Sequence, residues 1–584
     1  MIPPRLHPVI VGAVAAVVLF WNLGGAALWD EDEPKNAACS TAMLDRGDWI
    51  VPTFNGRLRV EKPVLVNWVH IAGFSVAGRN ETGARLGSAC LTVGTAILTW
   101  HLAAILLGPE AGLLAGLAMA ACIGTALSGR AATPDAPLAF CTTLGLWCFV
   151  AAGRGRPRGA PRDPRSLAGC GCALGAAMLA KGPVGLVLPL ASFLAAEIWN
   201  ACDDAEAVGV AGRARLVAAR IRPGILVAGA LVVALPWYVA VTLRTGGAWT
   251  EGFFLVHNVG RFAAPMEGHD GSAVLYYPLV LAVGFFPWSI VLAAALVHAA
   301  AVTRDAARVV APQRRDGMRL LVCWLACWVM AFSAAGTKLP GYVWPAYPAL
   351  AAITADFLAA WIRREAPSTA RCREPGPALD RVMGLAWTIL GLAGIGTALA
   401  LVLLAPSLPA LGRLAPIGVV PVAGALAALA CQRHARRGWA VALLAGTAVL
   451  FVALLAGAGT DAVGGARGAR HLVASLGERP GRGAWAGFGT IPPSVVFYAG
   501  DTIEPLESTE AVTGHLRSRP DAHLLVDSRY EMKLPERLPE GFGVLARRPQ
   551  LFGPGLVVIG PVRDSAPPTR PEPPLAWNTP VLPR

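Results

Sequence analysis

The chain has 584 residues, of which 55% are hydrophobic and only 15% are charged, and its mean hydropathy is +0.53. A soluble globular chain carries roughly 25% charged residues, so this composition excludes a cytosolic enzyme, a nucleic-acid-binding domain and a fibrous protein. The 50 basic residues outnumber the 37 acidic ones, which gives a net charge of +13. Most of this excess lies in short loops between apolar blocks, which indicates membrane topology rather than a nucleic acid partner.

Apolar blocks of about 20 residues, the length that a helix needs to cross a bilayer, fill most of residues 8–457. We interpret Pro8–Leu28 as a retained first span whose N-terminus lies in the cytoplasm. With it, the blocks predict a polytopic α-helical membrane protein of about thirteen transmembrane helices. The further spans are expected near 86–107, 111–130, 136–153, 166–180, 183–199, 224–243, 273–300, 320–335, 341–361, 382–404, 415–431 and 439–457.

The loops give the orientation independently. From Arg154 onward every second connection is rich in arginine, as short cytoplasmic loops are. The intervening loops, including 29–85 with its short juxtamembrane helices and 244–272, are therefore expected outside. An odd number of spans places the C-terminal region outside as well, in the periplasm of a Gram-negative cell. The predicted protein is thus a multi-pass protein of the bacterial inner membrane with a membrane domain at 1–457.

The chain changes character after the last apolar block. Short strands are expected at Ala484–Gly489, His523–Asp527 and Gly555–Ile559, with helices at 466–476 and 508–518 between them. Residues 458–564 are therefore predicted to form a small extracytoplasmic α/β domain. The Pro-rich segment 565–584 is expected to be a disordered tail.

Lysine is the rare basic residue, since 5 of the 50 basic residues are lysine. Three lysines stand beside a proline or glycine that limits a helix, in Glu61-Lys62-Pro63, Lys181-Gly182-Pro183 and Lys338-Leu339-Pro340. A lysine at the end of a span can simply extend its ammonium group to the interface. If Lys62, Lys181 and Lys338 converge on the outer face, they form a cationic pocket suited to a phosphate at membrane depth. Tyr342, four residues after Lys338, is expected to face the same phosphate.

Acidic residues are expected on the same face. Asp32 follows the first span, and Asp135 lies between two spans in Thr133-Pro134-Asp135-Ala136-Pro137. Each stands near a proline typical of a helix start, so helix capping explains both. Capping does not exclude chemistry, because a carboxylate fixed at a helix start is also well placed to receive a proton.

Glu61 has two interpretations. It pairs with the neighbouring Lys62, or it binds a divalent metal (zinc, magnesium or manganese) together with His257 or His269 of the outer loop 244–272. The sequence has no phosphate-binding glycine loop, so no nucleotide is expected as a cofactor.

Several short motifs follow one another in a fixed order through about residues 10–350. They are Asp32-Glu33, Gly47-Asp48-Trp49-Ile50-Val51-Pro52, Asn55-Gly56, Glu61-Lys62-Pro63, Asp135-Ala136-Pro137, Lys181-Gly182-Pro183, Pro236-Trp237, His257 to Phe262 and Lys338-Leu339-Pro340-Gly341-Tyr342. In this order they resemble the bacterial aminoarabinose transferases that modify lipid A. Those enzymes belong, with the protein O-mannosyltransferases, to the GT-C class of polyprenyl-phosphate-sugar glycosyltransferases. The C-terminal third is similar in layout alone.

The resemblance implies a role for each matching position. Asp32 corresponds to the catalytic aspartate of the first outer loop and Asp135 to the second acidic position. The donor phosphate would be held by Lys62, Arg261 and Tyr342, with Lys181 nearby. Glu61 with a histidine resembles a metal site of some members. The chain departs from the family at Asn36, where members often have a tyrosine, so one contact to the phosphate or the sugar would differ.

The expected function is therefore an inverting glycosyltransferase that moves a sugar from a polyprenyl phosphate, such as undecaprenyl phosphate. The acceptor would be lipid A, another glycolipid, a polysaccharide or a protein. With a hydroxyl acceptor Asp32 would act as the general base, whereas with an ionised phosphate acceptor it would orient the acceptor or stabilise positive charge on the sugar. A transporter or flippase for a lipid-linked anion is the alternative, but such proteins usually place charged residues within the membrane and show inverted repeats.

Overall fold

The computed structural model describes the chain in segments. These are residues 3–29, 31–157, 160–203, 209–265, 271–304, 310–364, 376–406, 409–464, 468–476, 481, 483–534, 538–548 and 555–562. The chain divides into two compact units. The first comprises Met1–Gly25, Cys39–Thr397 and Pro416–Ala458, and the second comprises Ala26–Ala38, Ala398–Ala415 and Gly459–Arg584. The helices α2 (Asp32–Arg46), α18 (Gly376–Leu404), η5 (Ala415–Gly418) and α21 (Arg437–Gly464) contribute residues to both.

The first unit is helical. Its helices up to residue 303 are η1 (Pro4–Leu6), α1 (His7–Phe20), α3 (Leu65–Ala77), α4 (Glu81–Leu107), α5 (Pro109–Ala120), α6 (Ile123–Ser128), α7 (Asp135–Ala151), α8 (Pro164–Lys181), α9 (Val184–Ala201), α10 (Gly209–Ile221), α11 (Pro223–Arg244), α12 (Ala248–Glu251), the π-helix η2 (Gly252–Gly260), α13 (Arg261–Ala263), α14 (Tyr276–Gly284), η3 (Trp288–Val291) and α15 (Leu292–Thr303). They are followed by α16 (Pro312–Ala334), η4 (Pro340–Ala346), α17 (Tyr347–Arg363), α18 (Gly376–Leu404), η5 (Ala415–Gly418), α20 (Val419–Arg433) and α21 (Arg437–Gly464). A short hairpin of β1 (Thr53–Phe54) and β2 (Arg57–Leu58) lies between α2 and α3.

Long apolar helices make the chain a multi-pass membrane protein. Within the described segments, eight helices are long and apolar enough to cross a membrane, or nine if the bent pair α14 and η3–α15 forms one span. The helix direction bends by 119° between the two halves of that pair. The polytopic α-helical class is therefore confirmed, and the count of thirteen spans stays a prediction.

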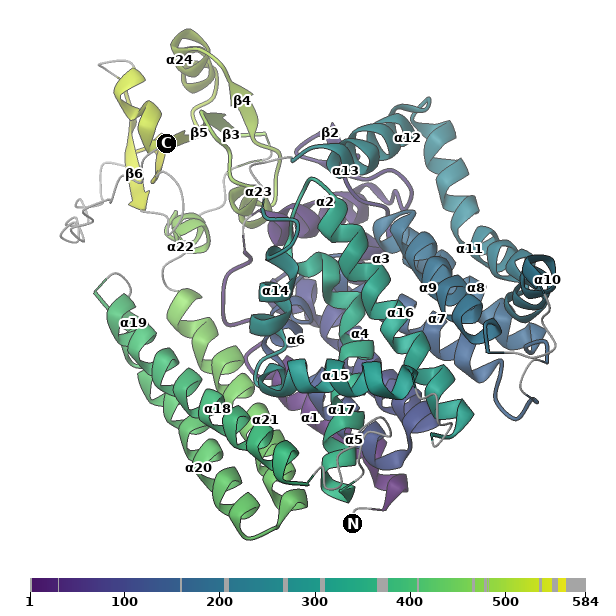
Figure 1. Ribbon diagram of the computed structural model, residues 1–584. Helices are drawn as coiled ribbons and strands as arrows, with labels where there is room; N and C mark the ends of the chain where they lie inside the picture. The colour runs from purple at the N-terminus through teal and green to yellow at the C-terminus, as the bar shows by residue number, and fades with distance from the viewer. Residues whose placement is uncertain are drawn as a thin grey trace. The chain divides into compact units, whose positions relative to one another are not determined.

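The helix α17 is the centre of the helical unit. Every side chain from Tyr347 to Trp361 is buried, which is typical of a helix surrounded by others on all sides. The helices α4, α5, α15 and α16 contact it (Figure 1). Apolar packing against α17 thus fixes the relative positions of α4, α5, α15 and α16.

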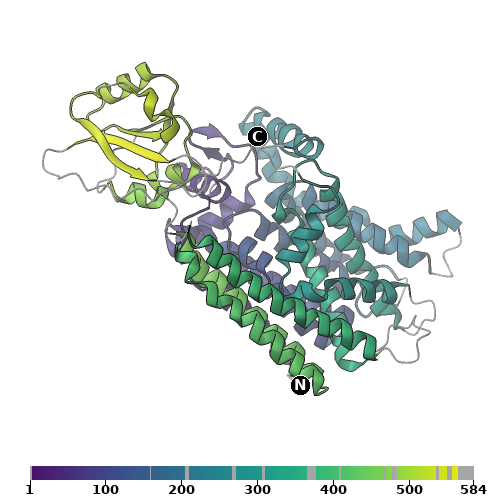
Figure 2. The same cartoon turned by 60° about the vertical axis from the view of Figure 1, so that its left-hand side comes forward.

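Three further helices follow α17 in the sequence. The helices α18, α20 and α21 run side by side (Figure 2). The indole Nε1 of Trp387 in α18 donates to Oε1 of Gln432 in α20 at 2.6 Å. A Cβ at Gly424 of α20 would lie 2.0 Å from the hydroxyl of Thr447 in α21, so glycine permits the close approach of these two helices.

The second unit contains a five-stranded sheet in the order β4-β3-β5-β7-β6. The strands are β3 (Trp485–Phe488), β4 (Glu504–Leu506), β5 (His523–Asp527), β6 (Phe542–Arg548) and β7 (Leu556–Pro561). The first three are parallel, and β7 is antiparallel to β5 and β6. The helical elements of this unit are α19 (Pro409–Gly412), α22 (Gly468–Ala474), α23 (Pro493–Ala499), α24 (Thr509–Ser518) and η6 (Ser528–Lys533). The central strands β3, β5 and β7 are almost wholly buried, as interior strands of such a sheet are.

The predicted elements agree with most of these bounds. The three strands expected after residue 480 are β3, β5 and β7, and the two expected helices are α22 and α24. Two expected spans are not single straight helices: the block 111–130 is broken into α5 and α6, and the block 273–300 is bent. The expected outer loop 244–272 contains the short helices α12, η2 and α13. The tail 565–584 lies outside the described residues.

Candidate active site

Asp135 and Lys181 form an ion pair between the ends of two neighbouring helices. Asp135 is the first residue of α7, and Lys181 is the last residue of α8, where Gly182 ends the helix with a φ of +84°. The ammonium group of Lys181 donates to Oδ1 of Asp135. Only 12% of the lysine side chain and 18% of the aspartate side chain are exposed. Reduced contact with water strengthens the attraction, and removal of either partner would leave a poorly solvated charge.

Tyr342 brings a third element, η4, to this ion pair. The Nζ atom of Lys181 lies 4.5 Å from the centre of the Tyr342 ring, within the range of a cation–π interaction. The ring also packs against Phe332 near the end of α16, with 4.8 Å between the ring centres. The position of the phenol is therefore set by packing as well as by charge.

Arg261 completes the cluster from a fourth segment. Its Nη1 donates to the hydroxyl of Tyr342 at 3.5 Å. The backbone fixes its position, because the N–H of Thr337 donates to the Arg261 carbonyl at 3.2 Å and that of Gly336 donates to the Phe262 carbonyl at 2.8 Å. The segment that carries Arg261 is thus attached to the segment that precedes η4.

The four residues Asp135, Lys181, Arg261 and Tyr342, the polar cluster, combine two cations with one carboxylate and one phenol. This set has an excess of positive charge and several hydrogen-bond donors, which suits an anion with several oxygens such as a phosphate. Held in place by helix ends and ring packing, such donors can stabilise charge that develops on a leaving phosphate. Sequence reasoning selected all four residues, and the structure brings them together.

Lys338 differs from its expected role. Its ammonium group donates to the carbonyl oxygens of Phe332 at 3.0 Å, Ser333 at 2.7 Å and Ala335. An ammonium group has three N–H donors, and these three carbonyls at the end of α16 accept from it. Burial lowers the pKa of Lys338. In this structure Lys338 caps a helix and supports η4, which argues against direct contact with a phosphate.

Glu61 and Lys62 lie in the segment after the β1–β2 hairpin. Oε2 of Glu61 accepts from Nε of Arg59 at 3.0 Å, and the Arg59 side chain is only 3% exposed. Lys62 is half-buried. The assignment of Lys62 to the donor phosphate stays a prediction.

The described donor set does not fit the expected divalent metal. Glu61 is engaged with Arg59, and His257 lies in the π-helix η2. His269 lies outside the described residues. Among the residues that the structure describes, no group of three or more His, Cys, Asp and Glu side chains could hold a metal ion.

Asp32 stands in the first turn of α2, in its second-unit portion. Its neighbour Glu33 is buried, and Oε2 of Glu33 accepts from the backbone N–H of Trp29 at 2.6 Å. The side chain of Glu33 thus connects the first turn of α2 to the backbone segment that precedes the helix. Asp32 is exposed, so its side chain is accessible for another role.

Sequence reasoning missed two residues beside Asp135. The hydroxyl of Thr133 donates to Oδ2 of Asp135 at 3.3 Å, and Gly341 faces the same carboxylate oxygen. Both residues stand within motifs that the sequence had singled out, but a motif alone does not show which side chains meet.

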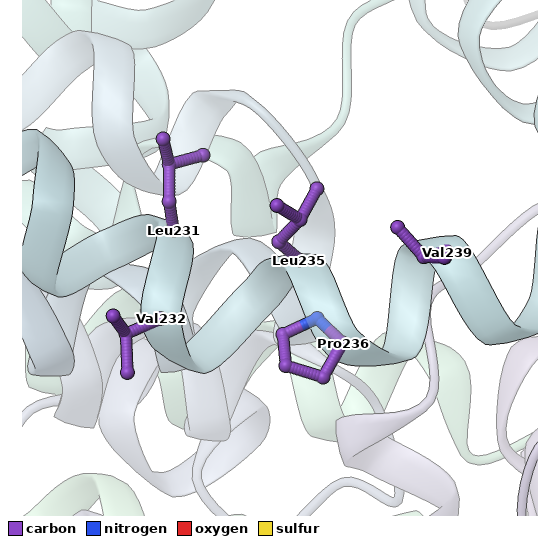
Figure 3. Close-up of a pocket in the computed structure, with 5 residues that line it drawn as sticks. All are labelled: Leu231, Val232, Leu235, Pro236 and Val239. Atoms are coloured by element: carbon purple, nitrogen blue, oxygen red, sulfur yellow. The ribbon is translucent and has the colours of Figure 1, made fainter.

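A pocket with only apolar lining residues lies on the surface of α11. Leu231, Val232, Leu235, Pro236 and Val239 line it, and all five belong to this one helix (Figure 3). The next residues face the other way: Trp237 and Tyr238 are buried, and the Tyr238 hydroxyl donates to the Met178 carbonyl of α8 at 3.0 Å. A helix with one exposed apolar side is what a span in contact with lipid requires.

The chain is similar to known membrane transferases. The family model described as dolichyl-phosphate-mannose-protein mannosyltransferase matches residues 61–204. A protein of Edwardsiella ictaluri named undecaprenyl phosphate-alpha-4-amino-4-deoxy-L-arabinose arabinosyl transferase is 30% identical over 448 residues, which are 73% of each chain. A protein of the same name from Pectobacterium carotovorum is 28% identical over 78% of this chain and 76% of its own.

A solved structure extends the similarity to nearly the whole chain. The crystal structure of ArnT from Cupriavidus metallidurans bound to undecaprenyl phosphate matches with a TM-score of 0.75 at 21% identity. The match covers 96% of this chain and 99% of the other. This match shows that the two chains share a fold.

Proposed function

The chain belongs to the family of the bacterial undecaprenyl phosphate-α-4-amino-4-deoxy-L-arabinose arabinosyl transferases, and from that premise we propose that it is a glycosyltransferase using a polyprenyl-phosphate-linked sugar. The donor is a sugar on undecaprenyl phosphate or a similar lipid, and the acceptor is lipid A or another molecule of the cell envelope. The observation that carries this proposal is the polar cluster, in which Lys181 and Arg261 both contact Tyr342, so that their donors lie close enough to bind one phosphate.

The reaction follows from the chemistry of the donor. The acceptor oxygen attacks the anomeric carbon of the sugar, and the bond between that carbon and the phosphate oxygen breaks with inversion. The electron pair leaves with the polyprenyl phosphate, whose growing negative charge Lys181, Arg261 and Tyr342 stabilise. Lys62 is assigned to the same phosphate by family resemblance.

The carboxylates have different roles in this scheme. Asp135 holds the ammonium group of Lys181 in position. We assign Asp32 as the general base when the acceptor is a hydroxyl, because the attacking oxygen must then lose a proton. When the acceptor is an ionised phosphate no proton is removed, and Asp32 orients the acceptor or stabilises positive charge at the sugar carbon.

The location of the reaction follows from the arginine distribution. Arginine-rich loops alternate along the chain, which supports a cytoplasmic N-terminus and a periplasmic C-terminal region in the inner membrane. The donor keeps its prenyl chain in the bilayer and presents its sugar at the outer face. The relatives are named as transferases, so a transporter is not favoured.

The test uses membrane vesicles that contain the protein and a labelled polyprenyl-phosphate sugar. The expected result is transfer of label to an envelope acceptor by the wild type and loss of transfer in Asp32→Asn. Asp45→Asn is the matched control, since Asp45 lies on the same helix and pairs with the exposed Arg79. Full activity of Asp32→Asn would remove Asp32 from the mechanism, and failure of the wild type with every envelope acceptor would overturn the proposal. Mass spectrometry of glycolipids from cells with and without the gene would identify the acceptor.

A further inference from the structure

We propose that Thr133 is a positioning residue that fixes the carboxylate of Asp135 in the orientation needed to hold Lys181. This inference rests on the proposed function, because it assigns Thr133 a part in the same transfer reaction. Thr133 acts through Asp135 and is not itself in contact with the reacting atoms.

The two oxygens of the Asp135 carboxylate have different partners. Oδ1 accepts from the ammonium group of Lys181, and Oδ2 accepts from the hydroxyl of Thr133 at 3.3 Å. Rotation of the carboxylate would break both contacts, so the pair of donors fixes its plane. Hydrogen bonds to a charged acceptor are stronger than those between neutral groups.

The hydroxyl of Thr133, which precedes α7, has a different kind of partner from the hydroxyls of the threonines within α7. Thr142 and Thr143 of α7 donate to carbonyls one turn earlier, at 2.8 Å and 2.6 Å respectively. That is the usual partner of a helical threonine. Thr133 precedes the helix and donates to a charged side chain instead, so its hydroxyl is placed by the turn to reach Asp135.

Gly341 limits the carboxylate from the other side. A Cβ at this position would lie 3.0 Å from Oδ2 and 3.3 Å from Cγ of Asp135. Gly341 is not among the residues with a positive φ, so its backbone conformation does not require glycine. Glycine is required here for space, because an added methyl group would press against the carboxylate oxygen that accepts from Thr133.

The orientation of the Asp135 carboxylate affects the donor phosphate through the position of Lys181. The ammonium group that Asp135 holds also lies over the Tyr342 ring, whose hydroxyl accepts from Arg261. A carboxylate free to rotate would let the ammonium group move away from the donor phosphate. Misplacement of a charge-stabilising group lowers the rate of the chemical step more than it lowers binding of the ground state.

The experiment compares the wild type with Thr133→Val, which keeps the shape and removes the hydroxyl, and with Thr133→Ser, which restores the hydroxyl. Thr143→Val, within α7, is the matched control. For each purified variant, kcat and the KM for a labelled polyprenyl-phosphate sugar are measured. Thr133→Val is expected to lower kcat by about tenfold to a hundredfold, the loss typical of one hydrogen bond to a charged group. Thr133→Ser should stay within about threefold of the wild type, since the hydroxyl alone is the feature at issue.

The split between kcat and KM separates positioning from packing. Thr133→Val should lower kcat while the KM for the donor stays within about threefold of the wild type, and Thr143→Val should change neither. Gly341→Ala tests the same geometry from the opposite side and should also lower kcat. If Thr133→Val does not fold, Thr133→Ala takes its place against Thr133→Ser.

Three results would overturn the inference: wild-type kcat in Thr133→Val, an equal loss in Thr133→Ser, or a change in Thr133→Val that is confined to KM. Each is distinguishable from failure of the proposed function. If the proposed function were wrong, the wild type itself would transfer no sugar. If only the role of Thr133 were wrong, the wild type would be active and the Thr133 variants would not show the expected losses.

Discussion

The ammonium group of Lys181 is shared between the carboxylate of Asp135 and the face of the Tyr342 ring, whose centre lies 4.5 Å from Nζ. The two partners stand on elements about two hundred residues apart in the sequence. A cation held by two neighbours, with little exposure to water, is pre-organised for an incoming anion.

Replacement of Lys181 by methionine should nearly abolish transfer. The variant keeps the length of the side chain but leaves the Asp135 carboxylate without its cation, and transfer should fall by about a hundredfold or more. The rate is measured with a labelled polyprenyl-phosphate sugar. Lys533→Met is the control, because Lys533 lies in the second unit beside Tyr530 and outside the polar cluster. Equal activity of the two variants would contradict the assignment.

Two replacements of Tyr342 should separate its ring from its hydroxyl. Tyr342→Phe keeps the ring beneath Lys181 and loses the contact with Arg261, so the KM for the donor should rise by about threefold to tenfold. Tyr342→Leu also removes the cation–π partner and should be more severely impaired. Steady-state kinetics with varied donor concentration would show the order. A larger defect in Tyr342→Phe than in Tyr342→Leu would refute this division of roles.

Lys338→Met should destabilise the protein before it affects donor binding. The variant leaves three carbonyl oxygens at the end of α16 without their donor, which should cost about 1–3 kcal/mol of the free energy of unfolding. The thermal midpoint in detergent is the measurement. An unchanged midpoint with a strongly raised KM for the donor would instead restore Lys338 to the phosphate site.

Acid should destabilise the sheet of the second unit through Asp527. Burial alone would raise the pKa of this carboxyl, but hydrogen bonds and charge from Arg529 lower it overall. A carboxylate with a lowered pKa in the folded state stabilises that state above its unfolded pKa, and this contribution is lost as the pH falls through the folded value. Protection of the β5 amides from hydrogen exchange, corrected for intrinsic rates, should therefore decline below about pH 4 in the wild type. The decline should be smaller in Asp527→Asn, and the same decline in both would show that another group is responsible.

The sequence predicted Lys181 from its place beside a helix-limiting glycine, Asp135 from its place near a helix start, and Tyr342 from its spacing to Lys338. Arg261 was predicted from the family resemblance. It could not predict the role of Lys338, since a lysine after a span looks the same whether it meets a ligand or the carbonyls of its own helix. Thr133 and Gly341 were hidden for a similar reason. Each of them matters because it lies close to one carboxylate oxygen of Asp135. Gly341 belongs to η4 and Asp135 to α7, so no local sequence pattern shows that they meet.

The apolar blocks predicted membrane helices but not their bends. An apolar run shows how much of the chain prefers lipid, but it does not show where a helix breaks, as the chain does between α5 and α6. Tertiary packing is close just after the break. At Gly124, the second residue of α6, a Cβ would lie 2.8 Å from the Tyr347 ring. The strands β4 and β6 were missed because they lie at the edges of the sheet and are only partly buried, so their hydrophobic pattern is weak.

Equilibrium binding of a polyprenyl phosphate to the purified protein tests the polar cluster most directly, because it needs neither the sugar nor the acceptor. The wild type should bind it, and Lys181→Met and Arg261→Met should each weaken binding by about tenfold or more, as expected for loss of a charge-assisted contact, with Lys533→Met unchanged. Undiminished binding in both cluster variants would show that the phosphate lies elsewhere.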